Sequence, residues 1–200
     1  MREWNRFATC VGMFLVLMLV EARLAVAAQS STSQDAQFCG EKAREFIHRP
    51  SGASVNALEA DASGCWSTIA HSDELLQSLI KVVAGGDVVA AAYLAPRIRR
   101  LEGGNLEDAL TALGEFAEKR MKEFLELVKA GKITTHELND SLTMLPLTLS
   151  DEPSAQLSAM KKRRAQVEQI TDPALSDYRA AALKSIDSFI AEIQVSMSSQ

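Results

Sequence analysis

The chain has 200 residues, of which 47% are hydrophobic and 24% are charged, and its formal net charge at neutral pH is −5. This length and apolar content suit one domain with a sizeable hydrophobic core. The acidic balance argues against a general affinity for nucleic acids or anionic membrane surfaces. No nucleic-acid partner is therefore expected.

The first 28 residues have the pattern of a cleavable secretory signal peptide. Arg2 and Arg6 precede an apolar run at residues 10–20, and small residues follow it. The run is shorter than the roughly 20 residues of a membrane helix, although an uncleaved anchor is the alternative. We predict cleavage after Ala28, which removes three arginines and two glutamates and leaves a net charge of −6. The mature chain is then expected in the periplasm or outside the cell, without a membrane span.

Two cysteines, Cys39 and Cys65, remain after the predicted cleavage. An even pair in a chain sent to an oxidising compartment predicts a disulfide. Two buried thiols are the alternative. The spacing does not match a zinc site, because neither cysteine has a second cysteine or a histidine close by.

The mature chain is predicted to form one domain. Residues 29–34 are polar and are expected to be disordered. Residues 35–200 form a single all-helical domain, in which the disulfide ties an N-terminal segment (35–66) to an array of helical hairpins (67–200). Because no run of alternating apolar and polar residues indicates a strand, the expected fold class is all-α, either an antiparallel helical bundle or a short stack of helical hairpins.

Apolar spacing and capping residues divide this domain into helices. Thr134 and Glu137 have the spacing of a capping box, and the segment after Asn105 is expected to form one uninterrupted helix. A short helix within a loop is expected at residues 51–64. The other predicted helices lie near residues 35–49, 67–84 (or 72–84), 87–101, 105–130, 134–145, 150–170 and 173–197.

Two corners of similar sequence, "GGD" at 85–87 and "GGN" at 103–105, separate predicted helices. A glycine in the left-handed conformation can end a helix, and Asp87 or Asn105 can cap the next one. The alternative is a phosphate-binding loop, but acidic residues follow the second corner where an anion would need a positive field. We therefore interpret both corners as turns.

Pro96 lies inside the predicted helix at residues 87–101. A proline within a helix removes one backbone hydrogen bond and typically costs about 3 kcal/mol. We expect a bend at this position or a division into two short helices.

The sequence has no clear catalytic, cofactor or metal site. The three histidines share no i, i+4 spacing, and no G-x-S-x-G motif is present. No cofactor is therefore expected. A hydrolytic enzyme with carboxylates from several helices, for example Glu102 with Glu115, is kept as an alternative.

Several basic and apolar residues are candidates for an interaction surface. The four residues of the basic run at 161–164 point in four directions on a helix. Arg164 falls within an apolar stripe, and we expect it to reach an acidic partner on another helix. The alternative is that its stem packs on the stripe while its charged head stays in water. Other candidates come from the arginines after Pro96 and from the apolar connector "MLPLTL". The candidate residues are Arg97, Arg100, Met144, Leu145, Leu147 and Arg164.

A disulfide-tied, exported helical domain without a visible active site is most consistent with protein binding. The predicted partner is another protein in the exported compartment. An inhibitor or immunity protein that blocks a toxin or enzyme is a specific form of this hypothesis. The alternatives are the hydrolytic enzyme and an oligomeric factor that maintains the cell envelope.

Overall fold

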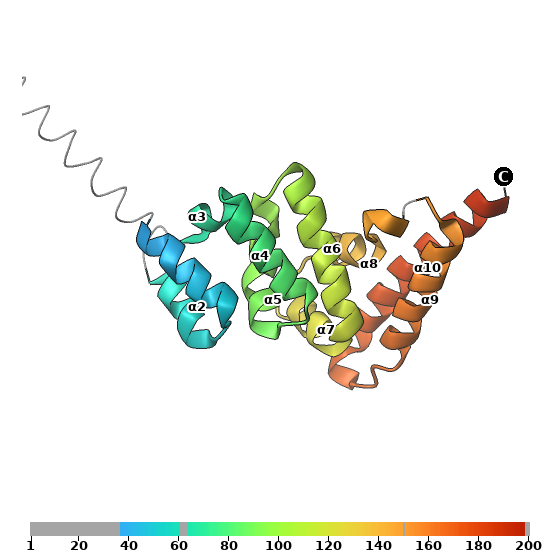
Figure 1. Ribbon diagram of the computed structural model, residues 1–200. Coiled ribbons are helices and arrows are strands. Elements are labelled where there is room, and N and C mark those ends of the chain that lie inside the picture. Colours follow the sequence, from blue (N-terminus) through green and yellow to red (C-terminus); the bar gives the residue numbers. More distant parts are fainter. Residues whose placement is uncertain (1–36, 61–63, 150, 199–200) are drawn as a thin grey trace, which may run out of the picture.

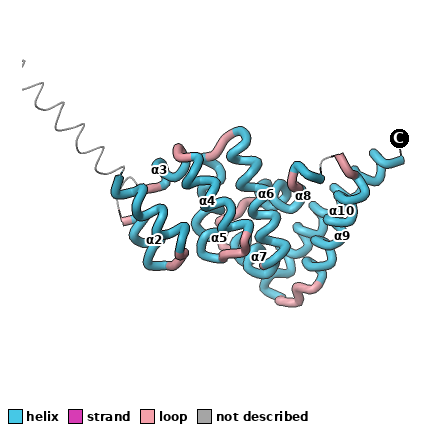
Figure 2. The backbone as a smooth tube through the Cα atoms, in the orientation of Figure 1, coloured by secondary structure: helices cyan, strands magenta, loops and turns pink. Residues whose placement is uncertain are grey.

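The computed structural model describes residues 37–60, 64–149 and 151–198 (Figure 1). The predicted signal peptide (1–28) and polar start (29–34) lie outside these residues. Every regular element in the described part of the chain is a helix, as Figure 2 shows, and the all-α fold class is confirmed. Among the described helices, none combines the length and apolar character needed to cross a bilayer.

The helices follow one another with short connections. The first covers residues 37–48. The others are α2 (Gly52–Glu59), α3 (Trp66–Ala70), α4 (Asp73–Ala84), α5 (Val88–Leu94), the 3₁₀ helix η1 (Ala95–Arg100), α6 (Gly103–Lys119), α7 (Met121–Lys129), α8 (Thr135–Thr143), η2 (Leu147–Leu149), α9 (Pro153–Glu168), η3 (Pro173–Leu175) and α10 (Ser176–Ser198).

The helices are laid out in chain order along an elongated molecule, with α2 near one end and the C-terminal end of α10 at the other (Figure 1). Helix α6 packs against α4 on one side and α8 on the other. Helices α9 and α10 form a hairpin, and α10 also packs against α8 and α7. One continuous apolar core extends through the described chain from Cys39 to Ile193.

The N-terminal helix is tied to the array by the disulfide that the sequence predicts. Cys39 lies in the helix at residues 37–48, Cys65 immediately precedes α3, and the two are bonded. Both side chains are buried. Helix α2 lies between the two cysteines in the sequence, so it is part of the loop that the disulfide closes.

The first glycine corner is confirmed as a turn, and the second is only partly as expected. Gly86 has a φ of 98°, and the Asp87 side chain accepts a 2.8 Å hydrogen bond from the backbone N–H of Ala90. At the second corner Gly103 has a φ of 55°, but α6 already begins there. Asn105 therefore lies inside the helix, and its predicted role as the cap is wrong.

Pro96 divides its helix as expected. Helix α5 ends at Leu94, and the chain continues as η1 with Pro96 in its first turn. The proline ring fixes φ and has no N–H, which the start of a helical segment does not need. The change from α to 3₁₀ geometry also sets the directions of the arginines that follow.

The predicted uninterrupted helix at residues 105–130 is wrong, because Arg120 separates α6 from α7 with a φ of −144° and a ψ of 52°. Neither glycine nor proline stands at this position, so no local signal announces the break. In a continuous helix the carbonyl of Glu118 would accept from the amide of Lys122. Here the Gln166 side chain of α9 donates to that carbonyl at 2.6 Å instead. A tertiary contact thus replaces the hydrogen bond that the break removes.

Other helix starts follow the local sequence. Thr134 and Glu137 form the predicted capping box at the start of α8. Ser72 caps α4 by accepting from the amide of Leu75. Ser51 and Ser54 form a further capping box at α2, which was not among the predicted caps.

Candidate functional site

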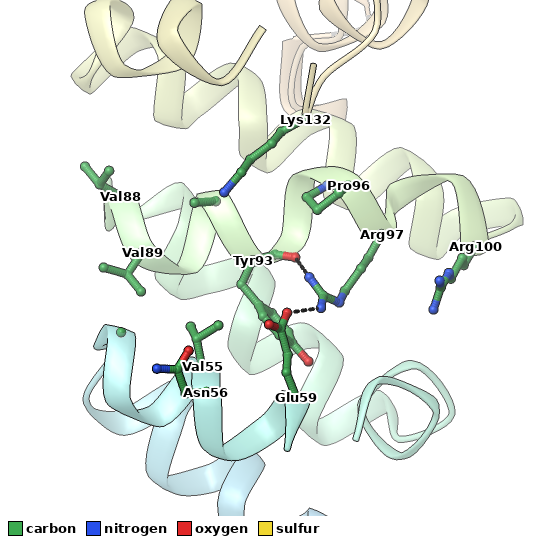
Figure 3. A pocket seen from close by; sticks show the side chains of 12 residues that line it. Val55, Asn56, Glu59, Val88, Val89, Tyr93, Pro96, Arg97, Arg100 and Lys132 are labelled. Carbon is green, nitrogen blue, oxygen red and sulfur yellow. Dashed lines mark hydrogen bonds and ion pairs between the residues drawn. The ribbon is translucent and has the colours of Figure 1, made fainter. Parts of the chain in front are cut away.

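A groove with a volume of about 570 Å³ lies between α2 and α5 and continues along η1 (Figure 3). We call it the α2–α5 groove. Its walls come from three helical elements, and one residue of the turn between α7 and α8 completes it. The lining residues are Gly52, Val55, Asn56, Glu59, Val88, Val89, Ala92, Tyr93, Pro96, Arg97, Arg100 and Lys132.

The groove has an apolar surface built from both helices. Val88 and Val89 in the first turn of α5 and Ala92 one turn later share one face of the helix. Val55 projects from α2 toward them (Figure 3). The side chain of Val88 remains exposed. The surface can therefore accommodate apolar side chains of a ligand.

The 3₁₀ geometry of η1 aims two arginines into the α2–α5 groove. Residues three apart in a 3₁₀ helix lie above one another, so Arg97 and Arg100 share a side and both line the groove. Arg99 points elsewhere, and its Nε donates to Oε1 of Glu137 in α8 at 2.9 Å. Pro96, which starts this geometry, is thus the local cause of the arrangement.

Arg97 is held by three contacts, two of which are drawn as dashed lines in Figure 3. Its Nη1 donates to the backbone carbonyl of Tyr93 at 2.7 Å, and its Nη2 donates to Oε1 of Glu59 at 2.5 Å. Its Cζ also lies 3.8 Å from the centre of the Tyr93 ring, which is a cation–π distance. The guanidinium therefore has a fixed position between α2 and α5.

The Tyr93 ring is anchored in the core. Its centroid lies 4.9 Å from that of Phe46 and 6.2 Å from that of Trp66. Burial raises the pKa of Tyr93 above its ordinary value of 10.0, and this effect outweighs the opposing charge of Arg97. The phenol consequently keeps its proton at neutral pH and is unsuited to act as a base.

The groove is positively charged although the chain as a whole is negative. Three of its lining residues are cations and one, Glu59, is an anion, and Glu59 is engaged by Arg97. Arg100 and Lys132 have no acidic partner within the described residues. Two cations are therefore available for a ligand.

These groups can bind a ligand but provide no evident chemistry. Within the described ranges, no three histidine, cysteine, aspartate or glutamate residues are grouped to hold a metal ion. In the enzyme alternative, Glu102 is the N-cap residue of α6 and Glu115 lies in its fourth turn, so the two are roughly 20 Å apart along the helix axis. That separation is too large for two carboxylates to flank one glycosidic bond.

The predicted interaction residues occupy three separate places. Only Arg97 and Arg100 lie together in the groove. Arg164 reaches Asp187 of α10 with a 2.7 Å hydrogen bond, so its expected acidic partner on another helix is confirmed.

The other three predicted residues belong to the connector between α8 and α9. Leu145 lines a second hollow of about 350 Å³ beside α6 and α9. The Leu147 side chain is 83% exposed. Met144 is partly buried, and its carbonyl accepts a hydrogen bond from Arg163. These residues do not extend the α2–α5 groove.

The contributions of α2 and Lys132 to the groove were not predicted from the sequence. Residues 51–64 were expected to hold only a short helix. Glu59 follows Val55 by four residues and Asn56 by three, and this spacing was the available signal for a common face. Lys132 carried no such signal, because only the tertiary fold brings it to α5.

Comparisons with protein families, curated proteins and solved structures found no match to this chain.

Proposed function

We propose that this protein is an exported, non-enzymatic binding domain that holds a segment of another protein in the α2–α5 groove. The observation that carries the proposal is the combination of an apolar surface with two cations that have no acidic partner in the described chain. Such a combination of apolar contact and a few placed polar groups is typical of binding sites. It supports recognition and does not require a catalytic group.

The proposal includes export to an oxidising compartment. The Cys39–Cys65 disulfide supports this location, because such bonds persist mainly outside the reducing cytosol. The basic, apolar and small-residue pattern of residues 1–28 supports it independently. Within this setting we favour an inhibitor or immunity protein, whose task requires binding alone.

The experiment is affinity capture of the tagged, oxidised mature chain from the exported fraction of its native cell. Two tryptophan variants on the same helix make it specific for the groove. Asn56→Trp places a bulky ring at an exposed position that lines the groove (Figure 3). Ala53→Trp places the same ring at an exposed position of α2 that does not line it.

A partner captured in near-equal amounts by the wild type and Ala53→Trp, but lost with Asn56→Trp, would support the proposal. A partner retained by Asn56→Trp would show that the groove is not the binding site. Circular dichroism of both variants checks that they remain helical. The activity of the captured partner, measured with and without this protein, then tests the inhibitor role.

A further inference from the structure

We infer that the segment bound in the α2–α5 groove is acidic and aliphatic, with carboxylates that pair with Arg100 and Lys132 and aliphatic side chains that pack on the valines of α5. This inference rests on the proposed function and specifies its ligand. The charge of the groove, its apolar surface and the internal pairing of Arg97 carry the argument.

Charge complementarity defines the acidic part of the ligand. The groove carries a net charge of +2 from Arg97, Arg100, Lys132 and Glu59, within a chain whose net charge is −5. This local reversal of sign attracts anionic segments and disfavours cationic ones. An acidic segment would otherwise be repelled by most of this protein, so the groove determines where it docks.

Arg100 and Lys132 are the residues free to make these contacts. Arg100 is exposed at the end of η1, and Lys132 is partly buried in the turn after α7. Figure 3 shows the Lys132 amine directed toward α5, and Arg100 lies apart from it, beyond Arg97. Two cations at separate positions favour a segment with at least two spaced carboxylates over a single small anion.

The apolar surface of the groove defines the aliphatic part. Val55, Val88, Val89 and Ala92 offer small aliphatic contacts, and aliphatic side chains placed on them remove apolar area from water. Pockets that enclose small ligands typically have volumes of roughly 300 to 1,000 Å³. The groove, at about 570 Å³, lies within this range, so it can take up a few side chains of a peptide but not a whole folded domain.

Arg97 has a different role because its charge is already used within the protein. Glu59 and the Tyr93 carbonyl occupy its Nη2 and Nη1 atoms at 2.5 and 2.7 Å. Glu59 is half-exposed and directs negative charge at the groove. Replacing Glu59 with glutamine should consequently strengthen the binding of an acidic segment.

The test begins with a displayed library of random peptides, selected on the immobilised, oxidised mature chain. Individual selected peptides are then synthesised with a fluorescein label, and their affinities are measured by fluorescence anisotropy. The charge-reversal variant combines Arg100→Glu with Lys132→Glu. Its matched control combines Lys161→Glu with Lys184→Glu, two exposed lysines of α9 and α10 outside the groove.

We expect the selected peptides to be enriched in aspartate or glutamate together with leucine, isoleucine or valine. Their affinity should fall about tenfold or more in the groove variant, change much less in the control, and rise in Glu59→Gln. Added salt should weaken binding to the wild type, because part of each charge contact is exposed to solvent.

The remaining outcomes separate the two proposals. Peptides that lack acidic enrichment, or that bind the groove charge-reversal variant as well as the wild type, would overturn the acidic ligand. If their binding were still lost with Asn56→Trp, the groove would remain the binding site. A library without binders, or binders unaffected by Asn56→Trp, would overturn both the ligand and the proposed function.

Discussion

Arg163 of α9 and Glu118 of α6 form an ion pair in which the Nε of the arginine lies 2.9 Å from Oε1 of the glutamate. The arginine side chain is 0% exposed. Its Nη1 also donates to the carbonyls of Leu142 and Met144, at 2.8 and 2.9 Å, where α8 ends. Carbonyls at the end of a helix lack partners within it. One buried guanidinium therefore joins three helices.

Replacing this arginine with an apolar residue should destabilise the protein strongly. Arg163→Leu leaves the carboxylate of Glu118 with only the exposed Lys162 as its ion-pair partner and leaves the α8 carbonyls without their donor. Breaking a buried ion pair in this way typically costs about 3 kcal/mol or more. We expect this loss in the free energy of unfolding measured by urea denaturation.

The neighbouring arginine is the control. Arg164 likewise forms ion pairs, with Asp187 and Glu168, but these two pairs lie at the surface. Exposed ion pairs contribute little, because water and salt screen them. Arg164→Leu should shift the melting temperature only slightly. Equal losses from the two substitutions would contradict a special role for the buried arginine.

Gly114 of α6 allows the close approach of α6 to α8. A Cβ atom at this position would lie 2.4 Å from the carbonyl oxygen of Ser141 and 3.0 Å from Nη2 of Arg163. Because the first of these is backbone, the helices would have to move apart. Gly114→Ala should therefore lower the free energy of unfolding by about 1 to 3 kcal/mol, although alanine is the better helix former.

A second glycine of the same helix separates crowding from helix propensity. A Cβ atom at Gly104 would have no other atom within 4 Å, apart from its chain neighbours and the backbone of its own helix. Gly104→Ala should be neutral or stabilising by up to about 1 kcal/mol. Chemical denaturation of both variants checks the contrast, and a stabilised Gly114→Ala would show that no close approach limits the site.

Local features of the fold were predictable because their causes lie within a few residues. The caps at Asp87 and Thr134 and the change of geometry at Pro96 depend on side chains next to the backbone groups that they satisfy or remove. At the start of α6, a local signal was not sufficient. Asn105 has a side chain suited to a cap, but the helix begins two residues earlier, at Gly103.

Features that depend on other helices were not predictable in the same way. The basic run at residues 161–164 contains four candidates, and the packing of α6 and α8 against α9 decides that Arg163 is the buried one. At the break before α7, the Glu118 carbonyl accepts its hydrogen bond from Gln166, which is 48 positions further along the chain. Only a small part of the candidate site was likewise predictable: Arg97 and Arg100 were candidates from the sequence, whereas Lys132 joins them only through the tertiary fold.

Glu137 should make the stability depend on acidic pH. Burial raises its pKa, but hydrogen bonds from the Thr134 amide and hydroxyl and from Arg99 outweigh burial, so the pKa lies below the ordinary value of 4.5. A carboxyl group with a lowered pKa stabilises the folded state above its ordinary pKa, and this contribution is lost as pH falls through the lowered value.

The comparison of wild type with Glu137→Gln measures this contribution. The melting temperature of the wild type should fall more steeply than that of the variant as pH decreases below about 4.5. The other carboxylates titrate in both proteins, so their effects on the melting temperature cancel when the two curves are compared. Parallel curves throughout the acid range would contradict the proposed role of Glu137.

The disulfide should support both the fold and the α2–α5 groove. Cys39 and Cys65 are 26 positions apart, and closing a loop of this length stabilises a protein by about 3 kcal/mol in the chain-entropy model. Replacing both cysteines with serine should lower the free energy of unfolding by that amount. Helix α2 lies inside the loop and forms one wall of the groove, so peptide affinity should fall as well. Unchanged stability would contradict the structural role of the bond, whereas lowered stability with unchanged affinity would show that α2 keeps its place through packing alone.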